Sequence, residues 1–201
     1  MPLRDHFRPP LHPKRCWGSF HAGWVNAVAD VLNLHLLPEG YFAEAFALPE
    51  ELPFVGIDRT YSVHVYQSDY PSPLLAVVEF VSLTTKESEY QRRAFVAKCK
   101  EYLKRRIGLM VVDIATVHLA NLHVDFMAEL GQTEGPKLPH TYAVSYRTVV
   151  RDTANHLELW AHELTIGETL PTLPLWLNDE ICLPIDLEAT YSSTYSRGRM
   201  P

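Results

Sequence analysis

One carboxylate stands inside a segment that otherwise has the composition of a buried strand. Residues 74–86 read LLAVVEFVSLTTK, and Glu79 interrupts the apolar run. Side chains of a strand alternate between two faces, so Glu79 is predicted to share a face with Val77 and Val81. An ionised carboxylate on a covered face is costly unless a cation compensates it. The pattern therefore predicts that Glu79 either lies at the strand end, where it reaches solvent or an arginine, or binds a metal ion.

Two further acids precede Glu79 in positions from which they could meet it. Asp58 lies just before an expected strand over 61–67, and Asp69 lies in the turn after that strand. Two carboxylates with one open side suit Mg²⁺, which proteins bind through one or two carboxylates plus water and phosphate. Such a metal polarises a phosphodiester and helps to ionise an attacking water. Asp58 is the preferred partner of Glu79, because Asp69 is expected to cap its own turn.

The expected helix over 87–106 is unusually basic. The stretch from 86 to 106 holds eight of the eighteen Lys and Arg of the chain against three Glu, a local charge of +5: Lys86, Arg92, Arg93, Lys98, Lys100, Lys104, Arg105 and Arg106. At about 100° per residue, most of these cations fall on a solvated face. Arg92 falls in the middle of the apolar arc and is predicted to point toward Glu79. That position favours a buried Arg92–Glu79 ion pair or a cation in a site, and both stay open.

A long run of the chain resembles a known superfamily. The run AVVEFVSLTTKESEYQRRAFVAKCKEYLKRRIGLMVVDI is similar to the restriction-endonuclease-like families of the PD-(D/E)XK superfamily. It is most similar to bacterial families of unassigned function with an E-[VL]-[LVF]-S-P strand end, a Lys- and Arg-rich helix and a G-[VL]-x-[LV]-V-[DE] strand. HFRPPL…WGSFH and LPTLPLWL…LPIDLEATY also look like these families. The resemblance touches most of the chain, with a specific core at about 57–115.

The resemblance implies an αβββαβ core and a metal-dependent nuclease site. In that superfamily an Asp at the start of one strand and a Glu on the next bind Mg²⁺, and a Lys two residues beyond the Glu aids catalysis. Carried over, Asp58 and Glu79 would hold the metal and take catalytic roles. The third position falls on Val81, which cannot do the work of a lysine.

Some relatives place the role of the lysine on a displaced residue. Lys86 is therefore assigned the third catalytic role, with Gln91, Arg92 and Lys98 as the other candidates. The resemblance also implies that helix cations meet nucleic-acid phosphates, and Arg92, Arg93 and Lys98 are assigned that contact.

The expected function is Mg²⁺-dependent phosphodiester hydrolysis with DNA as the partner. The alternative is a catalytically inactive relative that acts as an interaction or scaffold protein. A nucleic-acid-binding module without cleavage is a third reading, against which the net charge of −6 counts. A homodimer is left open.

The surrounding elements predict an α/β protein with a mixed central sheet flanked by helices. The expected elements are helices over 19–36, 87–106 and 118–130, strands over 41–47, 61–67, 74–81 and 109–114, an antiparallel hairpin over 141–150 and 156–164, and a closing helix within PIDLEATYSSTY. Ser19 is the expected N-cap of the first helix, and Gly108 the expected stop of the basic one. The helix between the strands over 74–81 and 109–114 predicts that they pair in parallel.

One domain over 1–201 is expected, with an extended arm over 1–18, the restriction-endonuclease-like core over 57–115 and a C-terminal β-rich extension over 116–201. The three cysteines form no C-x-x-C pair, and the ten histidines form no H-E-x-x-H motif, so neither a disulfide framework nor a zinc site is predicted. Asp113, in VVDI, either supports the Glu79 site or caps its strand. No apolar run suits a signal peptide or a membrane span, so a cytoplasmic protein without membrane contact is expected.

Overall fold

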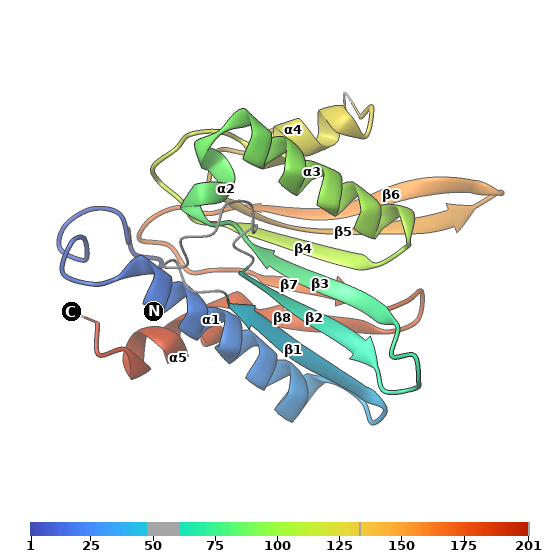
Figure 1. Ribbon diagram of the computed structural model, residues 1–201, viewed down its shortest axis with the longest axis horizontal. Helices are drawn as coiled ribbons and strands as arrows, with labels where there is room; N and C mark the ends of the chain where they lie inside the picture. The colour runs from blue at the N-terminus through green and yellow to red at the C-terminus, as the bar shows by residue number, and fades with distance from the viewer. Residues whose placement is uncertain (48–60, 133, 201) are drawn as a thin grey trace.

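A six-stranded mixed sheet forms the centre of the protein (Figure 1). The computed structural model describes residues 1–47, 61–132 and 134–200. The sheet has the order β1-β2-β3-β4-β5-β6, in which β3 and β4 are parallel and every other neighbouring pair is antiparallel. Its strands are β1 Tyr41–Ala47, β2 Tyr61–Gln67, β3 Leu74–Phe80, β4 Gly108–Asp113, β5 Tyr142–Arg151 and β6 Ala154–Glu163. The parallel pairing of β3 with β4, expected from the helical segment between them, is confirmed.

Helices and a small second sheet flank the central sheet. The helices are α1 Trp17–Val31, which continues into the π-helical turn η1 Leu32–Leu36, α2 Leu83–Glu87, α3 Glu89–Lys104, α4 Leu122–Glu129 and α5 Leu187–Arg197. The second sheet pairs β7 Thr172–Trp176 with β8 Cys182–Asp186. The expected β-rich C-terminal part thus divides: β5 and β6 continue the central sheet, and β7 and β8 form their own.

The strand alternation separates two hydrophobic cores. On one face, Ala76, Val78 and Phe80 of β3 pack with buried residues of α1, α5, β7 and β8. On the other face, Val77 and Val81 pack with the buried sides of α3 and α4. The predicted division of β3 into two faces is therefore correct, and Glu79 lies on the face that α3 covers.

The start of the first helix differs from the sequence prediction. The first helix starts at Trp17 rather than after Ser19, and its N-cap, Cys16, makes no side-chain capping bond. Trp17 is held by rings of the N-terminal segment, with its centroid 4.9 Å from Phe7 and 5.1 Å from His6. Packing of the arm thus sets this helix start in place of a capping side chain.

The expected basic helix over 87–106 corresponds to α3, and a short helix that was not predicted, α2, precedes it and is separated from it at Ser88. The side chain of Ser88 accepts a hydrogen bond from the backbone N–H of Gln91, so α3 begins with its own N-cap. Ser82 caps α2 in the same way, by accepting from Thr85. The break turns α2 away from α3 and lets Lys86 enter the interior, where it is 2% exposed.

Gly108 serves a different purpose from the predicted helix stop. The residue with left-handed backbone after α3 is Arg106, with φ of 58°. Gly108 instead opens β4 beneath the backbone of β7, where an added Cβ would lie 1.9 Å from the carbonyl oxygen of Trp176. A side chain at this position would therefore collide with backbone, which makes glycine the residue that lets the small sheet approach the large one.

Candidate active site

Glu79 lies in the middle of the sheet with almost no access to solvent. It is 1% exposed, and it is paired in register with Ser62 of β2 and Val111 of β4. Burial of an isolated carboxylate costs on the order of several kcal/mol, so the fold must supply partners for Glu79.

Two side chains of α3 supply them. Lys98 Nζ lies 3.1 Å from Glu79 Oε2, and the hydroxyl of Tyr102 donates to Oε1 at 3.3 Å. Lys98 and Tyr102 are four residues apart, so they lie on one side of the helix. The Lys98 side chain keeps 24% of its surface exposed, whereas that of Glu79 keeps 2%. The ammonium therefore lies between a buried carboxylate and solvent.

Arg92 does not reach Glu79. Its Nε lies 3.5 Å from Asp125 Oδ2 on α4, so the expected Arg92–Glu79 pair is wrong. Arg92 differs from Lys98 in its angle around α3, by about 120°, as well as in its height along the helix. Arg92 is in the first turn of α3, beside α4, and Lys98 lies about 9 Å further along at 1.5 Å per residue.

A chain of polar groups runs along β2 beside this pair. Ser62, His64 and Tyr66 share the face of Glu79, because they alternate with the buried Tyr61, Val63 and Val65 of the opposite core. His64 Nε2 lies 3.1 Å from Ser62 Oγ, and Nδ1 lies 3.2 Å from the hydroxyl of Tyr66. Both ring nitrogens of the imidazole are thus engaged.

The electrostatics of this cluster favour a neutral histidine and a protonated tyrosine. Burial, with a smaller contribution from the Lys98 charge, lowers the pKa of His64 to about 4. Burial and the neighbouring Glu79 carboxylate raise the pKa of Tyr102. At neutral pH the imidazole of His64 is therefore neutral, and the phenol of Tyr102 remains a donor.

Lys86 belongs to a second buried ion pair. Its Nζ lies 2.9 Å from Asp113 Oδ2 and donates to the carbonyl of His140 at 3.2 Å, and both charged side chains are 0% exposed. The other Asp113 oxygen accepts from the N–H of Ala115 at 3.0 Å. Burial raises the pKa of Asp113 to about 6, against the opposing effect of Lys86. Asp113 thus closes the end of its strand, and Lys86 connects α2 to that end.

Most cations of the basic helix lie beside carboxylates. Arg93 pairs with Glu89, Lys100 with Glu129 and Lys104 with Glu101, each at 2.5 Å. The Arg93 side chain is still 80% exposed, so its guanidinium remains accessible despite the pair. Of the residues assigned to phosphate contact, Arg92 and Arg93 therefore project from the surface near acids, while Lys98 points inward to Glu79.

Of the two expected metal ligands, Glu79 belongs to the described part of the chain. Asp58 lies outside the described residues, and Glu79 supplies one carboxylate. Within 1–47, 61–132 and 134–200, no group of three or more His, Cys, Asp or Glu is placed to hold a metal ion. Mg²⁺ is commonly bound by only one or two carboxylates, so Glu79 fits as one member of such a donor set.

The sequence prediction did not include Ser62, His64, Tyr66 or Tyr102. A signal for three of them was present, because YSVHVYQ alternates polar and apolar residues, and pairing of β2 with β3 aligns the polar ones with Glu79. Tyr102 carries no such signal, because its position among the apolar residues of the helix does not indicate a role for its hydroxyl.

The function of this protein has to be inferred from its geometry, because comparisons with known proteins found no family model, no curated protein and no solved structure that matches the chain. Among the described residues, no helix combines the length and apolar character needed to cross a membrane. The fold is thus a mixed α/β sheet flanked by helices, with a lysine–glutamate pair at the boundary of core and solvent.

Proposed function

We propose that this protein is a Mg²⁺-dependent phosphodiesterase of the PD-(D/E)XK class that acts on DNA. The observation that carries the proposal is the 3.1 Å contact between Lys98 Nζ and Glu79 Oε2. The resemblance leaves Val81 at the position of the strand lysine. Lys98 brings an ammonium from the following helix to the strand carboxylate, which is the displacement seen in some relatives of that superfamily.

The order of the elements supports the same proposal. One helix, three antiparallel strands, a helical crossover and a strand parallel to the third follow one another from α1 to β4. This order agrees with the αβββαβ core that the resemblance implies. Glu79 then lies on the third strand, where the metal-binding glutamate is expected.

In this proposal Glu79 and Asp58 would hold the metal, which when bound polarises a phosphodiester and lowers the pKa of a water. Tyr102 fixes one Glu79 oxygen through its hydroxyl, and Lys98 offers positive charge where the phosphate would gain negative charge. Lys86 leaves the catalytic set, because its ammonium is fully buried against Asp113.

Cleavage assays with matched variants test the proposal. Supercoiled and linear DNA would be incubated with the protein and Mg²⁺ or Mn²⁺, and Mn²⁺ binding would be followed separately by electron paramagnetic resonance. Glu79→Gln and Asp58→Asn are expected to abolish both cleavage and Mn²⁺ binding. Lys98→Met is expected to abolish cleavage but keep Mn²⁺ binding, because Lys98 is not a ligand.

Lys104→Met is the matched control, since Lys104 lies on the same helix and pairs at the surface with Glu101. It should cleave as the unaltered protein does. Cleavage that survives Glu79→Gln would refute the assignment of the site.

The alternative function is an interaction or scaffold protein that retains the fold without the chemistry. The ion pairs of the helix cations with Asp125, Glu89, Glu129 and Glu101 favour it, because they reduce the charge available to phosphates. It predicts neither Mn²⁺ binding nor cleavage of any DNA form. It also predicts that Lys98→Met changes only the stability of the protein.

A further inference from the structure

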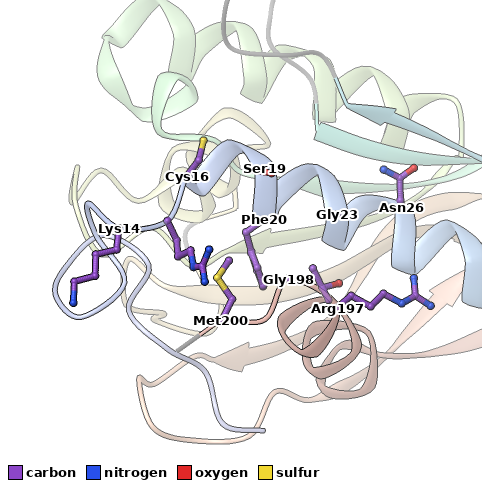
Figure 2. A pocket seen from close by; sticks show the side chains of 11 residues that line it. Lys14, Cys16, Ser19, Phe20, Gly23, Asn26, Arg197, Gly198 and Met200 are labelled. Carbon is purple, nitrogen blue, oxygen red and sulfur yellow. The ribbon is translucent and has the colours of Figure 1, made fainter.

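A groove on the other face of the sheet is distinct from the Glu79 cluster. It lies between α1 and α5 and has a volume of about 560 Å³ (Figure 2). Binding sites for small molecules commonly have about 300–1,000 Å³. Residues 14–16 before α1 and 198–200 after α5 close one end of it. The groove is thus large enough for an organic ligand.

The walls of the groove are set by close helix packing. An added Cβ at Gly23 of α1 would lie 3.2 Å from Thr194 Cγ2 of α5, so the two helices nearly touch there. One turn earlier on α5, Thr190 Oγ1 accepts a hydrogen bond from Trp24 Nε1 at 3.0 Å. The helices are therefore fixed relative to each other, and the groove is formed before any ligand arrives.

The lining combines an apolar floor with positive charge. The half-buried Met200 supplies apolar surface between the two helices, and Phe20, which is 3% exposed, also lines the groove. Figure 2 shows Phe20 and Met200 facing the space between the helices, with Lys14 and Arg197 toward its two ends. The eleven lining residues contain three cations, Lys14, Arg15 and Arg197, and no Asp or Glu, although the chain carries a net charge of −6.

The two arginines keep donors for a ligand. Arg15 Nη2 donates to the carbonyl of Arg199 at 2.9 Å, which holds its side chain beside the segment after α5. A guanidinium has five N–H donors, and this contact uses one of them. Arg197 lies 3.8 Å from Asp30 with 70% of its side chain exposed, a distance too long for a hydrogen bond.

We propose that this groove binds a small organic anion, with an apolar body on Met200 and the edge of Phe20, a carboxylate or phosphate group held by Arg15 at one end, and Arg197 adding positive charge toward the other end. An acyl carboxylate and an aryl phosphate share this chemistry. The site is independent of the proposed nuclease function, because its residues belong to α1, α5 and their flanking segments.

Methionine-methyl NMR gives a test that is specific for the groove. The chain has four methionines, and Met110 and Met127 are buried in the two cores, away from the groove lining. Octanoate, phenyl phosphate, octanol and octylammonium would each be titrated to about 10 mM, a range that includes weak binding. One or both anions should shift the Met200 methyl signal saturably and leave Met110 and Met127 unchanged. The anion that binds identifies the ligand class.

Matched double variants test the role of the charges. Arg15→Gln with Arg197→Gln should weaken anion binding by up to about fivefold, since an exposed charge pair contributes at most about that factor. Arg93→Gln with Arg151→Gln removes two exposed charges elsewhere and should leave binding unchanged. Thermal unfolding would show that both variants are folded. The proposal is overturned if octanol binds as well as octanoate, if no anion shifts Met200, or if the two double variants bind alike.

Discussion

Removal of the Lys86 ammonium should be among the most damaging single substitutions in this protein. Lys86→Met leaves the Asp113 carboxylate in a site where both side chains are 0% exposed. Loss of one partner of a buried pair costs about 3–5 kcal/mol. A protein of this size changes its melting temperature by about 2–4 °C per kcal/mol, so a fall of roughly 6–20 °C is expected.

The pH dependence of this loss identifies the carboxyl group responsible. Burial raises the pKa of Asp113 to about 6, whereas an unfolded Asp titrates near 4, roughly. A raised folded pKa gives a contribution to stability that is complete below the unfolded value and is lost as the pH rises through the folded value. Lys86 opposes that rise, so its removal raises the folded pKa further and extends the loss to higher pH. The cost of Lys86→Met should therefore be larger at pH 8 than at pH 5, by about 1.4 kcal/mol for each pKa unit of further rise.

Urea unfolding of four variants at both pH values checks this reasoning: Lys86→Met, Asp113→Asn, their combination and Lys104→Met. Lys86→Met combined with Asp113→Asn removes both charges and should cost less than the sum of the two single substitutions. Lys104→Met, at a pair whose side chains are about 60% exposed, should cost less than about 1 kcal/mol. A cost below about 1 kcal/mol for Lys86→Met, equal at both pH values, would contradict the buried pair described above.

Three further predictions concern other parts of the fold. Gly108→Ala should destabilise the protein by about 3 kcal/mol in chemical unfolding, because its Cβ would lie 1.9 Å from the Trp176 carbonyl oxygen. Gly135→Ala is the control and should be nearly neutral, since the nearest atom to its Cβ is the flexible Met127 Cε at 3.5 Å. The pKa of His64, about 4, should rise in Lys98→Met when followed by NMR, since the Lys98 charge contributes to lowering it, and an unchanged pKa would argue against their proximity. Burial lowers the pKa of His21 to about 3, so the unfolded chain takes up a proton first and stability should fall as the pH drops below about 6.5. His21→Phe should reduce that fall between pH 7 and 5 in urea titrations, and an unchanged slope would refute the burial of a neutral imidazole.

The strands could be predicted from the sequence because their alternation is local information. The pattern over 61–67 and 74–81 places each side chain on a face, and the structure agrees for β2 and β3. The parallel pairing of β3 and β4 was also accessible, since only a crossover can join parallel neighbours.

The partner of Glu79 was harder to predict than its face. A helical wheel gives the angle of each residue but not its height above the sheet, and it favours Arg92, which lies about 120° from Lys98 on the wheel. The height depends on where α3 begins, which the Ser88 cap decides. The burial of Lys86 was also not accessible from the sequence, because it lies on α2, a separate short helix that ends before Ser88.

Other features depend on contacts between distant segments. The groove between α1 and α5 joins residues more than 160 positions apart, and no local pattern brings Phe20 beside Thr194. The close approach of β7 to Gly108 also depends on a contact between segments that are distant in the sequence. Periodicity describes one element at a time, whereas these features arise when two elements pack.

The two-sided packing of β3 has a consequence for how the protein can change over evolutionary time. Ala76, Val78 and Phe80 contribute to one core, while Val77, Glu79 and Val81 face the other. Substitutions around Glu79, on α3 or along the polar side of β2, therefore leave the first core intact, which contains Trp24 and lies against α1 and α5. One half of the molecule can hold the fold together while the other half acquires, loses or relocates a reactive group. A lysine that moves from strand to helix is one change that such a division tolerates.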